Sequence, residues 1–221
     1  MDINNAKIIR SKRKTIAIVM QNDGSILIRA PLKARNLQIQ QFVNSKKNWI
    51  ETQQKKIIKR QVPAHMYLEG EKFLFLGKMY DLTLSNTIKL PLSLNGRFIL
   101  DKSKKHNAEL IFIKWYRERS RENFSERANY YSKKFGYRFN KIRISSARTR
   151  WGSCSSKGNL SFTWRLIMAP QEIIDYVIIH ELVHLRIKNH SSSFWSRVSE
   201  HEPDFKRKRK WLRENGHLLI L

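Results

Sequence analysis

The segment IIDYVIIHELVHLRIKNH, residues 173–190, places three of the chain's seven histidines and one glutamate in a mainly apolar run. Residues four apart on a helix project from the same face, so His180 and His184 are expected to lie one turn apart. This spacing suits two imidazoles that bind one tetrahedral zinc ion. Glu181 follows the first histidine and could reach a water on the metal without being a ligand, as in zinc hydrolases with a glutamate general base.

The apolar neighbours of these polar residues indicate that the helix is buried. Buried histidine and glutamate side chains without partners would destabilise the fold. The alternative is that both histidines make hydrogen bonds in the core while the glutamate is solvated. A His-Glu-x-x-His pattern arises by chance in roughly 1% of chains of this composition, so we favour the metal site.

The third ligand that we favour is His190, six residues after His184. That separation does not continue the same helical face, so the chain must turn between them. Asn189 is a residue that tolerates the left-handed conformation at a helix end, and Ser191 is suited to cap the next helix. Four rival ligands lie on the following segment: Glu200, His201, Glu202 and Asp204.

The chain is strongly basic, with 44 lysines and arginines against 18 acidic residues and a net charge of +26. The excess is spread along the sequence instead of being confined to a tail. A surface of this kind attracts polyanions such as nucleic acid, nucleotides or anionic lipid headgroups. The alternative is a solvated surface with no dedicated partner, so non-specific nucleic-acid contact through the basic surface is a hypothesis at this point.

Cysteine content and hydropathy favour a cytoplasmic protein. The single cysteine, Cys154, excludes an internal disulfide and fits a reducing compartment. The apolar run Ile16–Met20 is far too short to cross a bilayer, and no small-residue cleavage site follows it. We therefore expect no membrane span.

Residues 1–105 are expected to form a β-rich lobe with one basic helix. The predicted strands are TIAIVM (15–20), SILIRA (25–30), KFLFLG (72–77), KMYDLTL (78–84) and FILD (98–101). The turn Asn22-Asp23-Gly24 predicts a hairpin between the first two. Apolar residues at helical spacing predict one amphipathic helix over 36–60, capped by Asn36. Its basic face is more simply a solvated surface than a nucleic-acid site.

Residues 106–221 are expected to form a second lobe. Helical spacing of apolar and aromatic residues predicts a long helix from Ala108 to about Phe135, ended by Gly136. Alternating patterns then predict two strands joined by a turn at residues 157–159. Pro170 is placed to open the helix that carries the histidines.

Three motifs together resemble the YgjP-like metallopeptidase family, which is related to SprT-type and WLM-type proteases. The matching stretches are RTRWGSCSSKGNLSFTWRLIMAP (148–170), IDYVIIHELVHLRIKNHSSSFW (174–195) and HEPDFKRKRKWL (201–212). The matching elements run from about Tyr137 to Leu212, and the β-rich first half also fits the family.

This resemblance implies one zinc ion on His180, His184 and His190, with Glu181 as the catalytic base. It also implies that the RWGSC hairpin flanks the active-site cleft. The implied fold class is α+β, with a β-rich N-terminal lobe followed by a zincin-like lobe that holds an active-site helix and a small antiparallel sheet. A nucleoside-triphosphate hydrolase activity has also been associated with the family.

Arg148, Arg150 and Trp151, which precede Gly152, are candidates for substrate binding. An arginine here could hold a substrate carbonyl, a phosphate or a developing oxyanion. The alternative is that Trp151 fills the core while the arginines pair with acids of the active-site helix. Cys154 is better explained as a small packing residue than as a nucleophile.

The function that we expect is zinc-dependent hydrolysis of peptide bonds, with a metal-bound water activated by Glu181. Because of the basic surface, the substrates are expected among proteins associated with nucleic acid. A first alternative is a metal-dependent pyrophosphohydrolase of nucleoside triphosphates such as UTP. A second is a nucleic-acid-binding module with a structural zinc, although structural sites usually have four protein ligands.

Overall fold

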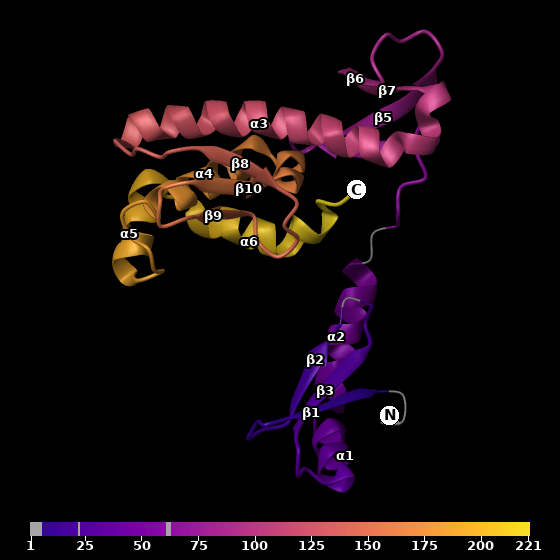
Figure 1. Cartoon of the computed structure of the whole chain (residues 1–221), viewed down its shortest axis with the longest axis vertical. Coiled ribbons are helices and arrows are strands. Elements are labelled where there is room, and N and C mark those ends of the chain that lie inside the picture. The colour runs from indigo at the N-terminus through magenta and orange to yellow at the C-terminus, as the bar shows by residue number, and fades with distance from the viewer. Residues whose placement is uncertain (1–5, 22, 61–62) are drawn as a thin grey trace. The chain divides into compact units, whose positions relative to one another are not determined.

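The computed structural model describes residues 6–21, 23–60 and 63–221 (Figure 1). The chain divides into two compact units, Met1–Pro63 and Ala64–Leu221. No helix among the described residues combines the length and the apolar composition that a membrane span requires.

The first unit is a three-stranded sheet with two helices. Its elements are β1 (Lys7–Ser11), β2 (Ala17–Met20), β3 (Ile26–Pro31), α1 (Asn36–Ser45) and α2 (Lys47–Arg60). The central strand β3 pairs antiparallel with β2, as the hairpin pattern predicts, and parallel with β1. Gly24 has the left-handed conformation that the hairpin turn requires, with φ of 84°, whereas Asn22 lies outside the described residues.

The helix expected over residues 36–60 is two helices that meet at Lys46. The backbone of Lys46 leaves the helical region, with φ of −107° and ψ of 8°, and its N–H bonds to Val43 O at 3.0 Å. The break lets Ile39, Val43 and Ile50 all reach the small core of this unit. The cap also differs from the prediction, because Arg35 and not Asn36 occupies the N-cap position.

The second unit begins with a four-stranded sheet and a long helix. The sheet has the order β4-β5-β7-β6. The elements are β4 (Lys72–Phe75), β5 (Lys78–Ser85), β6 (Leu92–Asn95), β7 (Arg97–Asp101), η2 (Lys102–Asn107) and α3 (Ala108–Phe135). The helix has the bounds expected from its periodicity, and Gly136 ends it with φ of 69°.

The division at residue 63 differs from the boundary expected near residue 105. An aromatic cluster explains the difference, because it joins the four-stranded sheet to α3. Phe112 stacks on Phe73 at 4.3 Å between ring centroids, and Trp115 lies edge-on to Phe98 at 5.0 Å. The sheet therefore shares its core with the helix that follows, and residues 64–105 belong to the C-terminal unit.

A second sheet and three helices complete this unit. The elements are β8 (Ile142–Ser145), β9 (Gly152–Cys154), β10 (Leu160–Thr163), η3 (Trp164–Met168), α4 (Gln171–Val183), α5 (Ser192–His201), α6 (Phe205–Asn215) and η4 (Gly216–Leu218). The sheet has the order β8-β10-β9 and is mixed, not purely antiparallel, because β8 runs parallel to β10. The fold class is α+β, as expected.

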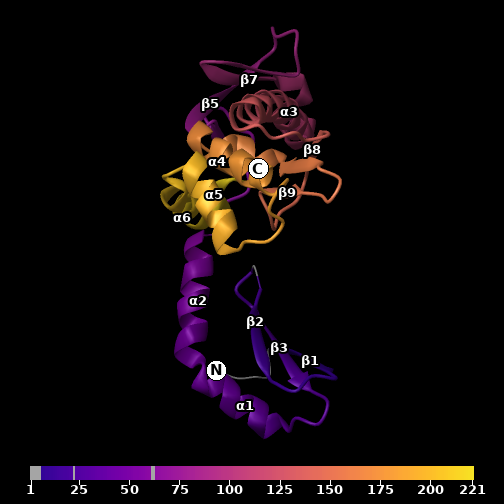
Figure 2. The same cartoon turned by 90° about the vertical axis from the view of Figure 1, so that its left-hand side faces the viewer.

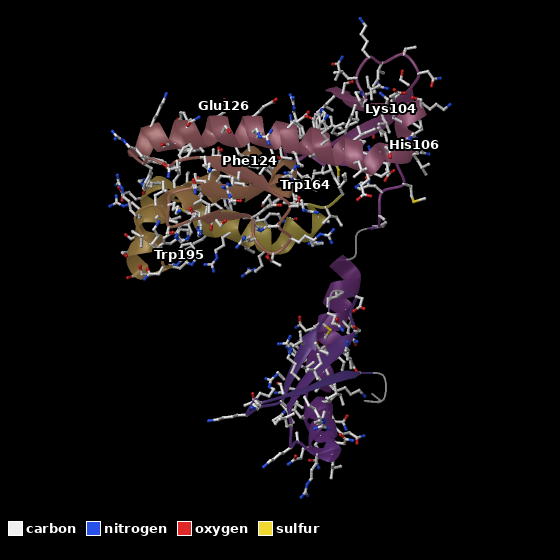
Figure 3. All side chains as sticks on the ribbon, in the orientation of Figure 1. Lys104, His106, Phe124, Glu126, Trp164 and Trp195 are labelled. Carbon is white, nitrogen blue, oxygen red and sulfur yellow. The ribbon has the colours of Figure 1, made fainter. Side chains whose placement is uncertain are left out.

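The histidine-bearing helix α4 lies in the core of the second unit. Its residues Ile173–Ile179 are all buried. The long helix α3 runs along the sheet, as Figures 1 and 2 show from two directions, and it packs against both α4 and β8. Figure 3 labels Phe124 on α3 and Trp164 next to that helix, and both side chains are buried. This packing buries α4 on the sides that face the sheet and α3.

Candidate metal centre

Helix α4 ends earlier than its sequence pattern suggests. The last helical residue is Val183, and His184 is the C-cap with φ of −62° and ψ of −16°. The chain then tightens into a turn, in which Leu185 N–H bonds to Leu182 O at 3.1 Å. Asn189 is not among the described residues with positive φ, so the expected left-handed end at that residue is wrong. The turn that presents His190 begins directly at the second histidine.

The three histidines of the motif converge on one point. His190 Nε2 lies 3.1 Å from His184 Nε2 and 3.0 Å from His180 Nε2. Three nitrogens that bind one tetrahedral zinc ion at 2.0–2.1 Å would be about 3.3 Å apart. The cluster therefore has the size and the donor type of a metal site.

The surroundings of the rings favour the form that binds a metal. His184 Nδ1 lies 2.9 Å from Ile187 O, so a proton on Nδ1 is donated to that carbonyl and the lone pair of Nε2 faces the cluster. Phe194 is fully buried and lies 4.4–4.8 Å from all three imidazoles, measured between ring centroids. The turn after α4 and helix α5 thus hold the rings in place.

Burial also keeps the first two imidazoles neutral. Burial, together with the smaller repulsion from the neighbouring His184 and His190, lowers the pKa of His180 to about 3. Burial lowers the pKa of His184 as well. Neutral imidazole is the form that binds a metal ion.

Glu181 is a buried carboxylate beside this cluster. The residue is only 5% exposed, and within the described chain its Oε2 atom has no hydrogen-bond partner. Burial raises the pKa of Glu181 to about 8, against the opposing charge of Arg150. An unpaired buried carboxylate is unfavourable unless it acts on a bound group, and a metal with its water is such a group.

Gly152 on β9 faces the glutamate and makes room for it. A Cβ atom at this position would lie 2.6 Å from Glu181 Oε1 and 2.7 Å from its Cγ, so no side chain fits without moving the carboxylate. The sequence pattern predicted no role for Gly152. The available indication was a glycine next to a predicted strand, which can mark a close approach of another group.

A cavity of about 440 Å³ opens beside the cluster, and its walls include Trp151, Gly152, His180 and Glu181. Of the three candidate substrate-binding residues, Trp151 lines this cavity. Arg150 is exposed, and its charge acts on Glu181.

The other side chains of this loop lie away from the cavity. Arg148 is exposed and does not line it. Within the described residues, neither Arg148 nor Arg150 forms the ion pair with an acid of α4 that was the alternative, since Asp175 pairs with Arg127 and Glu172 with Arg207.

Cys154 is half-buried on β9. Burial raises the pKa of its thiol above the usual value. A raised pKa disfavours the thiolate, which is the nucleophilic form of cysteine. This environment agrees with a packing role.

The four rival ligands are engaged elsewhere. Glu202 bonds to Lys208 at 2.6 Å, Glu200 to Arg197 at 2.9 Å, and His201 Nε2 lies 3.0 Å from the hydroxyl of Tyr137. Asp204 lies 3.8 Å from Arg207. None of the four joins the cluster formed by the histidines in the described parts of the chain.

Comparisons with known proteins place the chain in a family. No match was found among curated proteins. The crystal structure of the metallopeptidase zymogen of Pyrococcus abyssi abylysin is 24% identical with a TM-score of 0.38, over 41% of this chain and 93% of that chain. That score is too low to support an argument. The family described as "YgjP-like, metallopeptidase domain" matches residues 14–215. The chain therefore belongs to the YgjP-like family of metallopeptidase domains and is a metallohydrolase.

Proposed function

We propose that the C-terminal unit is a zinc peptidase in which His180, His184 and His190 bind one zinc ion and Glu181 is the general base. The observation that carries the proposal is the convergence of three Nε2 atoms beside a buried carboxylate. His190 Nε2 lies 3.0–3.1 Å from the Nε2 atoms of His180 and His184, and one oxygen of Glu181 has no hydrogen-bond partner within the described chain. Structural zinc sites usually have four protein ligands, whereas catalytic sites have three. The three donors found within the described residues therefore favour a catalytic zinc site over a structural one.

Zinc bound here would supply a Lewis acid that polarises a scissile carbonyl and lowers the pKa of water. In this proposal the carboxylate of Glu181 takes the proton from the attacking water and passes it to the leaving amine. Burial makes this carboxylate more basic than an exposed one, which is the direction that a proton acceptor needs. Gly152 keeps the space that the carboxylate occupies.

The position of β9 supports an extended peptide as the substrate. It is an edge strand of its sheet, and its first residue, Gly152, faces Glu181. An edge strand can pair with an added strand through backbone hydrogen bonds. A peptide held along β9 would pass beside the general base.

A further part of the proposal concerns the place of action. The net charge of +26 would concentrate the protein on nucleic acid, so proteins bound there would be its substrates in the cytoplasm. Cleavage of a DNA-binding protein and of a neutral unfolded protein, each with and without DNA, tests this part. Equal rates under all four conditions would contradict it.

The central test uses zinc-loaded protein with two panels of substrates, unfolded proteins and nucleoside triphosphates. Cleavage of protein that is lost in the Glu181→Gln variant is the expected result. Turnover of triphosphates alone would reject the peptidase. Peptide cleavage that is unchanged in Glu181→Gln would reject the assigned base.

A further inference from the structure

The cavity beside the histidine cluster also has a basic wall. Arg209 and Arg213 on α6 both line it, together with His180 and Glu181. The two arginines are four residues apart, so they project from the same face of their helix. The cavity therefore has His180 and Glu181 of α4 on one wall and two guanidinium groups of α6 on another.

Arg209 is held in position by an aromatic ring. Its Cζ atom lies 4.8 Å from the ring centroid of Trp195, the residue on α5 that is labelled in Figure 3. Trp195 in turn stacks on His190, with 5.5 Å between centroids and 20° between the planes. Arginine on an aromatic face keeps its N–H groups free for another partner.

Neither arginine is neutralised by a strong ion pair. In the described part of the chain no acidic group lies within 4.0 Å of Arg209, and Arg213 has only Glu214 at 3.9 Å, with both side chains more than half exposed. Exposed pairs at that distance contribute little.

The rest of the cavity suits a group with an apolar stem and a polar end. Trp151, Val177 and Leu212 supply apolar surface. Tyr176 is 4% exposed, and among the described residues its hydroxyl makes no hydrogen bond to protein. Burial raises the pKa of Tyr176 to about 12, so the hydroxyl keeps its proton and can donate it.

We propose that Arg209 and Arg213, with the hydroxyl of Tyr176, bind a carboxylate of the peptide substrate next to the scissile bond. This inference rests on the proposed peptidase function and names its preferred substrates, peptides with glutamate or a free C-terminus at that position. The apolar walls accept the methylenes of a glutamate, and paired guanidinium groups match a carboxylate. The cavity of about 440 Å³ has room for such a side chain.

The test measures binding separately from cleavage. Labelled peptides that differ only by Glu or Gln at one position, and by a free or an amidated C-terminus, are titrated into zinc-loaded Glu181→Gln protein by fluorescence anisotropy. We expect the carboxylate form to bind about 10-fold more tightly than its neutral partner. The Glu/Gln pair and the free/amidated pair separate the two sources of the carboxylate.

Two double variants separate the proposed site from general attraction by a basic protein. Arg209→Ala/Arg213→Ala should reduce the preference to about 1. Lys206→Ala/Lys210→Ala removes the same charge from the same helix, at exposed positions that do not line the cavity. This control should keep the preference. No preference in the Glu181→Gln protein, or an equal loss in both double variants, would overturn the inference.

Cleavage of the same peptides by the zinc-loaded protein distinguishes this inference from the proposed function. A preference that depends on Arg209 and Arg213 without any cleavage would support the carboxylate site and contradict the peptidase. Cleavage that does not discriminate between Glu and Gln peptides, with equal binding of both, would support the peptidase and contradict the carboxylate site.

Discussion

Helices α4 and α6 line the same cavity but use their polar residues in opposite ways. In α4 the polar side chains Asp175 and Glu181 are buried, and the first pairs with Arg127 while the second has an oxygen without a partner. In α6 the basic residues are mostly exposed, and only Lys208 is buried, against Glu202. A polar residue on a buried helix therefore indicates a structural or functional role by itself. A basic residue on an exposed helix indicates such a role only when the structure shows which cavity or group it faces.

The largest effect is expected from Glu181→Gln, which keeps the shape of the side chain and removes the proton acceptor. We expect kcat/KM for peptide cleavage to fall by about 10²- to 10⁴-fold, because general-base catalysis contributes that much. Metal analysis should give the same zinc content as in the unchanged protein. A loss of zinc together with activity would show that Glu181 is needed for metal binding and not only for proton transfer.

His190→Ala tests whether the exposed end of the cluster is a ligand. Zinc affinity should fall by roughly 100- to 1,000-fold, because one of the donors that share the binding free energy is lost. Competition with a chromogenic chelator measures the change. The matched control is His201→Ala, which removes a rival histidine that contacts Tyr137 and should leave zinc affinity unchanged. The opposite pattern would make His201 the ligand.

Asp175→Ala breaks the buried ion pair of α4. Arg127 bonds to both carboxylate oxygens at 2.6–2.7 Å, and its side chain is 26% exposed, so removal of Asp175 should lower the free energy of unfolding by about 2–3 kcal/mol, within the range for hydrogen bonds to charged groups. Urea denaturation measures it. The matched change on the same helix is Glu172→Ala. Glu172 forms an exposed pair with Arg207, so this change should lower the free energy of unfolding by less than about 1 kcal/mol. Equal effects would show that burial does not distinguish the two pairs.

Gly152→Ala should give the smallest change in activity. The added methyl group would displace the Glu181 carboxylate, so kcat/KM should fall by about 10-fold or more while zinc content is kept. Ser153→Ala, on the same strand, is the control and should have little effect. Full activity in Gly152→Ala would mean that the Glu181 carboxylate can shift to make room for the methyl group without loss of catalysis.

Local patterns were sufficient for much of the fold and for the centre of the site. Helical spacing predicted α3 from Ala108 to Phe135, and the i, i+4 spacing predicted that His180 and His184 share a face, where their rings lie 4.9 Å apart between centroids. These features depend on neighbours a few residues away, which the sequence displays directly. The family resemblance agrees with the family match.

Features that depend on distant contacts were missed. The first strand, β1, pairs in parallel with β3 some twenty residues later, and its short, mostly exposed sequence does not show the apolar alternation that would predict a strand. The break at Lys46 follows from packing against a sheet, and the early end of α4 follows from the hydrogen bonds of the turn. Arg209 and Tyr176 acquired a role only when the fold placed them around one cavity.

The stack of Arg209, Trp195 and His190 has a thermodynamic consequence. One indole contacts both a residue of the proposed metal site and a residue of the proposed carboxylate site. An ion that restricts the His190 ring further would also restrict Trp195 and, through it, the guanidinium group. Binding of the two ligands would then be cooperative by linkage, because restriction that one ligand has already produced need not be repeated for the other. The metal would then raise the affinity for the carboxylate, and the carboxylate would raise the affinity for the metal by the same factor.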